Sequence, residues 1–232
     1  MKKYNNSPGG KVLTFIRELA NHNNREWFSQ HKDDYEEAKA LFEQMVQDAI
    51  LRISTFDKSV EMLQPKDCTY RIYRDIRFSE DKSPYKRHMG AYICARGKQS
   101  LHGGYYIHLQ PEECLLAGGC YYFPPKLLQQ VRHTIIDNID EYRAIVDSPD
   151  FKKYYQIIGE ERLKGAPKGF KKDNPYLKYI QPKQYDTMYA VPDEFFCSPD
   201  WLDNLEKAFR PLKKFLDFIN YPVDEYLDNY EE

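Results

Sequence analysis

The chain has 232 residues and a formal net charge of -2, and 41% of its residues are hydrophobic. This length and apolar content are enough for a sizeable core, which excludes an intrinsically disordered protein. The nearly balanced charge argues against a general binder of nucleic acids or anionic membranes, because such proteins are usually strongly basic. The 20 tyrosines and 13 phenylalanines predict a core with polar groups at its rim.

Five cysteines are scattered along the chain, and no two have the Cys-x-x-Cys spacing of a zinc site or a redox motif. The histidine spacings match no established metal motif either. We therefore expect reduced cysteines, no metal and no cofactor. The N-terminal lysines are followed by no apolar stretch, so we expect no signal peptide, and no segment has the length of a membrane span. These features predict a cytoplasmic protein without a membrane partner.

In the first quarter of the chain, apolar residues recur at helical spacing. This pattern predicts one amphipathic helix over residues 11–20 and a longer one over 32–54. Between them, Asn23 and Glu26 have the spacing of a capping box, which predicts that Asn23 opens a turn.

Strand patterns dominate the next part. Apolar and charged residues nearly alternate over 68–74, which predicts a strand that leads into an irregular loop. The short connections between the strands that follow favour an antiparallel meander. Gly118 and Gly119 predict a bulge or a close approach of two backbones. The three strands of the meander are predicted at 90–96, 104–109 and 114–123.

The second half of the chain is mainly helical. Helices are predicted from Pro125, from Ile139 and from Ser148, with a strand over 185–191. A last long helix follows Ser198, with a kink at Pro211, and the acidic tail after Val223 is expected to fray.

Helices that flank a run of strands predict an α+β fold rather than alternating α/β units. We expect a single domain over residues 1–232, with an ordered core of about 11–220. Its largely antiparallel sheet would combine the three-strand meander with the strand at 68–74, packed against helices from both ends of the chain.

Residues 70–86 contain the densest group of charged side chains that could form a binding site. They interleave arginines, lysines and acidic residues with large apolar side chains, which predicts a half-buried segment whose charges are paired. The guanidinium fork binds carboxylate or phosphate oxygens two at a time, so the cations predict an anion pocket in which Asp75 and Asp81 orient the forks. The alternative is an internal salt-bridge network that orders a loop. The cations are Arg71, Arg74, Arg77, Lys82 and Lys86.

Two further groups could complete such a pocket. Tyr106 and His108 alternate along one predicted strand and so share a face, where they could transfer protons. A hydrogen-bonded core histidine is the alternative. Lys168, between Pro167 and Gly169, could add a cation or form an ordinary exposed turn.

The spacing of this segment resembles the bacterial domain-of-unknown-function family 2461. The motif of that family reads Arg-x-x-Arg-Asp-x-Arg-Phe, then three residues, Asp or Asn, Lys, two residues and Tyr. The resemblance extends from about Val12 to Phe218 and implies one domain. The matching motif residues are Arg71, Arg74, Asp75, Arg77, Phe78, Asp81, Lys82 and Tyr85.

Two functional hypotheses follow. In the first, the protein is an enzyme or binding protein for a small phosphate- or carboxylate-bearing ligand, with Asp75 and His108 as catalytic groups. In the second, it is a non-catalytic interaction module whose charged segment is a structural network or docks an acidic partner. A nucleic-acid partner fits the overall charge poorly. The ligand-binding residues of the first hypothesis are Arg71, Arg74, Arg77, Asp81, Lys82, Tyr85, Tyr106 and Lys168.

Overall fold

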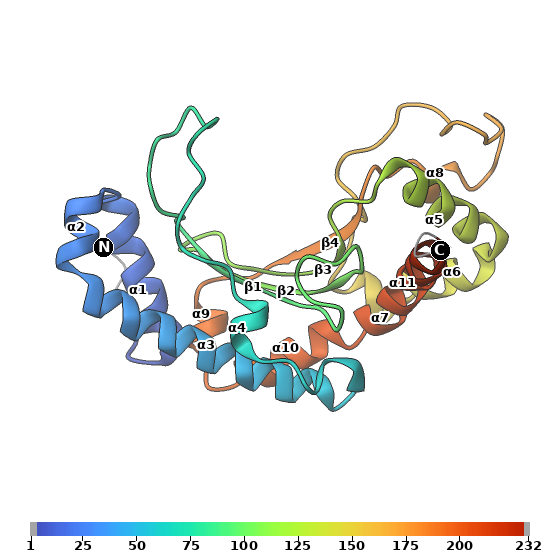
Figure 1. Ribbon diagram of the computed structural model, residues 1–232. Coiled ribbons are helices and arrows are strands. Elements are labelled where there is room, and N and C mark those ends of the chain that lie inside the picture. The colour runs from blue at the N-terminus through green and yellow to red at the C-terminus, as the bar shows by residue number, and fades with distance from the viewer. Residues whose placement is uncertain (1–3, 230–232) are drawn as a thin grey trace. The chain divides into compact units, whose positions relative to one another are not determined.

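The computed structural model describes residues 4–229 and has an α+β fold with a four-stranded antiparallel sheet (Figure 1). The strand order is β1-β2-β3-β4, so each strand pairs with its neighbours in sequence and the predicted meander is confirmed. The strands are β1 (Met89–Ile93), β2 (Gly104–Leu109), β3 (Leu115–Cys120) and β4 (Tyr185–Ala190).

The chain groups into two compact units, each assembled from separate segments. The first comprises the residues up to Lys98 together with Tyr106–Leu116 and Ala190–Lys207. The second comprises Gln99–Tyr105, Ala117–Tyr189 and the residues from Ala208 onward. The single domain over 1–232 stays a prediction.

Three helices open the first unit: α1 (Pro8–Asn21), α2 (Arg25–Gln30) and α3 (Lys32–Ser54). The Ser7 hydroxyl accepts a hydrogen bond from the backbone N–H of Gly10, and Pro8 fills the first turn, where a missing N–H costs nothing. Both long helices confirm their predictions. The short elements of this unit are η1 (Lys58–Val60), α4 (Pro65–Cys68), α9 (Glu194–Cys197) and most of α10 (Trp201–Phe209).

The predicted capping role of Asn23 is wrong. The N-cap of α2 is Asn24, whose side chain accepts a hydrogen bond of 2.9 Å from the backbone N–H of Trp27. The Asn23 amide is engaged with the backbone of Tyr85 instead. Adjacent asparagines made the sequence pattern ambiguous by one residue.

The predicted strand over 68–74 is also wrong, and the fourth strand of the sheet is β4. Pro65 starts the short helix α4, which ends at Cys68, and only isolated bridges follow, Thr69 with Ala91 and Tyr73 with Tyr85. The segment then folds back on itself, because Arg74 N–H donates to the Pro84 carbonyl and Lys86 N–H to that of Ile72.

Residues 71–86 therefore form a narrow loop between α4 and β1, which we name the arm (Figure 1). Its charges are less buried than predicted: Arg71, Asp75, Arg77, Asp81 and Lys82 are exposed. Apolar burial is limited to its base, where Ile72 and Tyr85 are inside the protein.

The second unit holds the remaining helices around an aromatic core that includes Tyr142, Phe151, Tyr155 and Phe215. The hydroxyl of Tyr155 donates to the Ala208 carbonyl at 3.0 Å, so its burial leaves no unpaired polar atom. The helices are α5 (Pro125–Asp137), α6 (Ile139–Val146), α7 (Pro149–Lys152), α8 (Leu177–Ile180) and α11 (Leu212–Asp228).

The close backbone approach predicted at the paired glycines is confirmed. A Cβ atom on Gly118 would clash with Leu212, and one on Gly119 would clash with the carbonyl oxygen of Tyr185. Gly119 also has a φ of +113°, which a residue with a side chain rarely adopts.

The end of the chain differs from the prediction. Pro211 separates α10 from α11 rather than kinking one helix, since its ring and missing N–H disrupt the preceding turn. The tail after Val223 continues as helix to Asp228, and residues 230–232 lie outside the described part. Among the helices of residues 4–229, none is long and apolar enough to cross a membrane.

Candidate functional site

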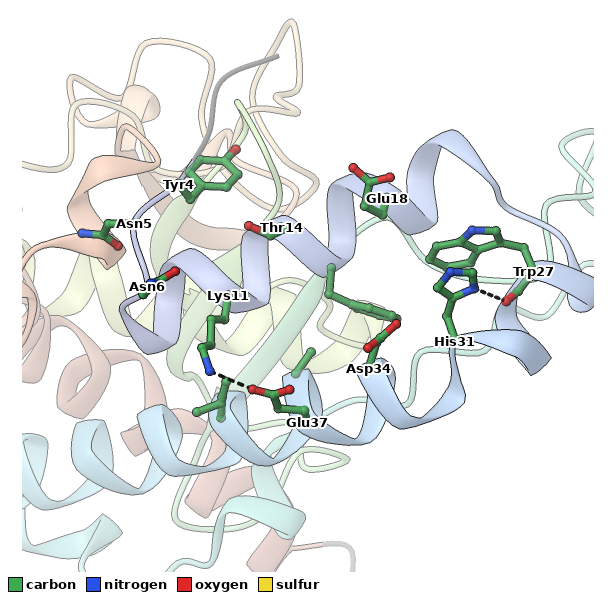
Figure 2. Close-up of a pocket in the computed structure, with 13 residues that line it drawn as sticks. Tyr4, Asn5, Asn6, Lys11, Thr14, Glu18, Trp27, His31, Asp34 and Glu37 are labelled. Carbon is green, nitrogen blue, oxygen red and sulfur yellow. Dashed lines mark hydrogen bonds and ion pairs between the residues drawn. The ribbon is translucent and has the colours of Figure 1, made fainter.

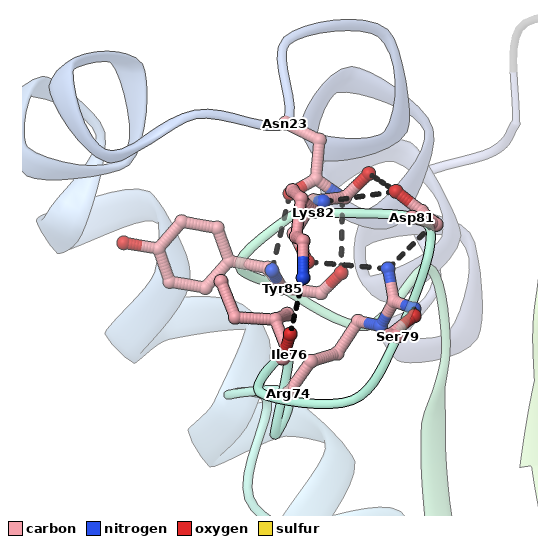
Figure 3. A network of polar contacts seen from close by, with 8 residues as sticks. Asn23, Arg74, Ile76, Ser79, Asp81, Lys82 and Tyr85 are labelled. Carbon is pink, nitrogen blue, oxygen red and sulfur yellow. Dashed lines mark hydrogen bonds and ion pairs between the residues drawn. The ribbon is translucent and has the colours of Figure 1, made fainter.

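Arg74 is the centre of a polar network inside the arm (Figure 3). Its Nη1 donates to Asp81 Oδ2 at 2.6 Å and to the Ser83 carbonyl at 3.1 Å, and its Nη2 donates to Ser79 Oγ at 3.2 Å. Asp81 also accepts from the backbone N–H of Ser83 at 2.9 Å. The hydrogen bonds from Ser83 and Arg74 hold the pKa of Asp81 well below its usual range. The Arg74 fork is thus occupied within the arm.

The other cations of the arm's outer part are engaged in the same way. Arg77 contacts both carboxylate oxygens of Asp75, with the shortest distance 2.7 Å from Nη2 to Oδ2. These bonds lower the pKa of Asp75. Lys82 Nζ donates to the Ile76 carbonyl at 3.1 Å. Both pairings order the loop.

Asn23 fixes the base of the arm to the connection between α1 and α2 (Figure 3). Its side-chain amide donates to the Tyr85 carbonyl at 3.0 Å and accepts from the Tyr85 N–H at 3.1 Å. The Tyr85 ring stacks on Phe28 with a centroid separation of 4.0 Å. Tyr85 is therefore a buried anchor of the arm.

A second group of chemically active side chains lies on one face of β2, beside the arm's base. Tyr105, Ile107 and Leu109 are buried on one face of this strand, whereas Tyr106 and His108 alternate with them and are partly exposed. Tyr106 Oη lies 3.0 Å from His108 Nδ1, and the His108 ring lies 4.4 Å from that of His88 between centroids. Lys86 and Tyr70 act electrostatically on His88 and Tyr106, and Arg71 acts on Lys86. We name the whole group the sheet-face cluster; it comprises Tyr70, Arg71, Lys86, His88, Tyr106 and His108.

A glycine makes this arrangement possible. A Cβ atom on Gly90 in β1 would lie 2.5 Å from Tyr106 Oη, so a side chain there would displace the hydroxyl. The open backbone of β1 therefore lets Tyr106 lie across the neighbouring strand.

The two cations of the sheet-face cluster differ from those of the arm's network. Lys86 Nζ lies 5.3 Å from the centroid of the Tyr70 ring, a cation–π contact. Within residues 4–229, neither Lys86 Nζ nor the Arg71 guanidinium has a hydrogen bond or an ion pair of 4 Å or less. The positive charge of Arg71 helps to lower the pKa of Asp75, but the Asp75 carboxylate accepts its hydrogen bonds from Arg77.

Burial sets the protonation states in this cluster. It lowers the pKa of His88 to about 4, and the neighbouring His108 ring and the positive charge of Lys86 add to the effect. Burial also lowers the pKa of His108 and raises that of Tyr106. The two imidazoles are therefore neutral and the phenol protonated at neutral pH. Burial, and the charge of Arg71, lower the pKa of Lys86.

The predicted site residues thus fall into separate groups. Arg74, Asp75, Arg77, Asp81 and Lys82 pair within the arm, and no interaction among the described residues links them to His108. Tyr106 and His108 contact one another on β2 instead, and His108 also contacts His88, whose pKa the charge of Lys86 helps to lower. Lys168 belongs to the second unit, where its backbone carbonyl accepts from Gln129.

His88 and Tyr70 were missed by the sequence reasoning. The signal for His88 was present, because Lys86 and His88 alternate just before β1 in the period-2 pattern of a strand. Tyr70 carried no distinguishing signal, since tyrosine is frequent throughout the chain.

The first unit also contains a hollow of about 400 Å³ between α1 and α3 (Figure 2). Its walls include Glu18, Asp34 and the Lys11–Glu37 ion pair of 2.8 Å. At one end the His31 ring stacks on Trp27 at 4.0 Å. None of the predicted site residues lines this hollow.

All five cysteines are buried as free thiols. In the described part of the chain, no three His, Cys, Asp or Glu side chains are grouped in a way that could hold a metal ion.

Comparison with known proteins identifies the class to which this architecture belongs. The family model described as "Conserved hypothetical protein (DUF2461)" matches residues 11–218, so the chain belongs to this family. That description names no reaction or ligand.

A curated relative comes from the archaeon Archaeoglobus fulgidus and is described as "Uncharacterized protein". It is 30% identical over 79 residues, which cover 34% of this chain and 29% of that protein. No solved structure matches.

Proposed function

We propose that the protein binds a small carboxylate- or phosphate-bearing ligand at the sheet-face cluster, with Arg71 and Lys86 as its cations. The observation that supports this most strongly is that these two cations have no hydrogen-bonded anion among the described residues. Burial, and then the like charge of Arg71, lower the pKa of Lys86, and a bound anion would offset both effects.

The ligand would then lie away from Arg74, Arg77 and Lys82. Their donors are directed at Asp81, Asp75 and the arm's own carbonyls, so a ligand would have to displace existing bonds. The arm's network would then be structural: it would order the arm and so position Arg71 and Lys86 beside the sheet.

The neighbouring groups suit proton transfer. His88 and His108 are neutral near pH 7, so each can accept a proton from a bound ligand, and Tyr106 can carry it onward through its 3.0 Å contact with His108. We propose that the protein acts in the cytoplasm, where five reduced cysteines would persist.

A second candidate function is an interaction module. Phe78 near the tip of the arm is 95% exposed, with the Arg77 guanidinium 5.9 Å from its ring centroid. Exposed aromatic and arginine side chains on an ordered loop are typical anchors at protein interfaces. The outer arm, residues 74–82, carries three cations and three anions, so the anchor would be apolar rather than electrostatic.

Thermal unfolding tests the first proposal against a panel of acetate, pyruvate, phosphate and a nucleotide at constant ionic strength. A ligand at 100 times its Kd stabilises the folded state by about 2.7 kcal/mol. We expect one anion class to give a saturating rise in Tm that Arg71→Gln abolishes and that Arg77→Gln, the matched control on the arm, retains. Phe78→Ala should also retain it.

No rise beyond that given by sodium chloride would overturn the anion site. Equal losses in Arg71→Gln and Arg77→Gln would return the ligand to the arm. Because both variants remove one exposed guanidinium from the same segment, their comparison separates local binding from a change in net charge.

A further inference from the structure

Lys86 has surroundings that few lysines share. Lysine usually keeps its ammonium group in water while the stem packs on the protein. Here the side chain is half-buried, its Nζ lies 5.3 Å from the centroid of the Tyr70 ring, and no oxygen within residues 4–229 accepts a hydrogen bond from it. Arg71 carries a charge of the same sign, and this charge adds to the effect of burial in lowering the pKa of Lys86.

These are the conditions that activate a lysine amine as a nucleophile. A lysine next to a second cation and an apolar ring loses its proton more readily, and the neutral amine attacks carbonyl carbon. Burial and Arg71 both lower the pKa of Lys86, so the neutral fraction at a given pH exceeds that of an exposed lysine.

We propose that the sheet-face cluster takes 2-oxo acids and that Lys86 forms an imine with their carbonyl group. This inference rests on the proposed anion site and specifies its ligand. Arg71 would hold the carboxylate through two parallel hydrogen bonds. In a 2-oxo acid the carbonyl carbon is bonded directly to the carboxylate carbon, so a carboxylate held by Arg71 brings the carbonyl to the neutral amine of Lys86.

The step balances without a further reactant. The neutral Lys86 amine attacks the carbonyl carbon, a C–N bond forms, and the oxygen takes up the proton that the nitrogen releases. A second proton transfer from nitrogen to oxygen expels the oxygen as water and leaves the C=N bond. The reaction releases one water molecule and needs no oxidant or reductant.

The cluster also supplies the proton carriers that this step needs. The positive charge of Lys86 contributes to the lowered pKa of His88, two residues further along the chain, and the centroid of the His88 ring lies 4.4 Å from that of His108. Both imidazoles are neutral and can take a proton from the amine, while Tyr106 can give one to the departing oxygen.

Reductive trapping tests the inference on the full chain. The protein is incubated with pyruvate and sodium cyanoborohydride, and the modified lysine is located by intact mass and peptide mapping. We expect Lys86 to be labelled at least about tenfold faster than exposed lysines such as Lys82, because a held carboxylate raises the local carbonyl concentration. Arg71→Gln should reduce labelling by pyruvate to the level given by acetone, which lacks the carboxylate.

Lys86→Arg is the second variant, since it keeps the positive charge and cannot form an imine. It should lose the label and retain stabilisation by acetate. Labelling of Lys86 no faster than of Lys82 in wild type would overturn the imine, and a rise in Tm with pyruvate in the same sample would leave the anion site standing. Absence of both label and Tm rise would overturn both.

Discussion

Asn23 provides the sharpest stability test of how the arm is held. Its amide makes two hydrogen bonds to the backbone of Tyr85, at 3.0 and 3.1 Å, and Tyr85 is 5% exposed. Asn23→Ala would leave a buried N–H and a buried carbonyl without partners. An unsatisfied buried group costs about 1–3 kcal/mol, and partial access of water to this site sets the expected loss for the pair at about 2 kcal/mol.

Asn24→Ala is the matched control, because it changes the same residue type one position along. It removes the N-cap of α2, which should cost about 1 kcal/mol, and leaves the arm in place. Asn23→Asp should have a stability between those of Asn23→Ala and Asn24→Ala. The aspartate carboxylate can still accept a hydrogen bond from the Tyr85 N–H, but it cannot donate one to the Tyr85 carbonyl.

The assay is urea denaturation followed by tryptophan fluorescence, which reports on the first unit because Trp27 and Trp201 both belong to it. Each variant is also titrated with the stabilising anion. Asn23→Ala should weaken anion binding, whereas Asn24→Ala should not. A loss of unfolding free energy in Asn23→Ala no larger than in Asn24→Ala would refute the anchoring role.

Two further predictions concern Gly119 and Asp186 of the second unit, with Gly97 of the first unit as a control. Gly119→Ala should cost at least about 2 kcal/mol of unfolding free energy, because alanine would be strained at a φ of +113° and its Cβ would clash with the Tyr185 carbonyl. Gly97→Ala, with a φ of +85° and open space around it, should lose only the strain term of about 1 kcal/mol, and equal losses would contradict the close approach. Burial raises the pKa of Asp186 from 3.8 to about 6, so the folded state binds the proton more tightly and stability should fall as pH rises from about 4 to 6. Asp186→Asn should flatten this pH dependence and, after allowance for partial exposure, raise the unfolding free energy at pH 7 by about 1–2 kcal/mol. The measurement is the urea midpoint as a function of pH. The same slope in wild type and variant would contradict the prediction.

Periodicity predicted the elements that bury a continuous apolar stripe. The helix over 32–54 and the strand over 104–109 match their observed bounds, because packing and local pattern agree there. The family resemblance was likewise carried by residues at fixed spacing and is confirmed by the match over 11–218.

The error over 68–74 arose where charged residues could pair in more than one way. Alternation over 68–74 looked like a strand, yet Arg74 and Asp81 satisfy one another across a loop, which a pattern of neighbours cannot reveal. The spacing of Lys86 and His88 places both side chains on one face of an extended segment. The contact of His88 with His108 on β2 cannot be predicted from this spacing, because it depends on the pairing of β1 with β2.

The measurement that tests the central claim most directly is histidine NMR. The imidazole resonances of ring-labelled protein are followed while the stabilising anion is added at constant pH and ionic strength. We expect saturating shifts for His88 and His108 in wild type and in Arg77→Gln, and their loss in Arg71→Gln. The resonances of His22 and His133, which lie outside the cluster, should not move. Shifts that appear only in histidines outside the cluster, or that survive in Arg71→Gln, would contradict an anion site on this face of the sheet.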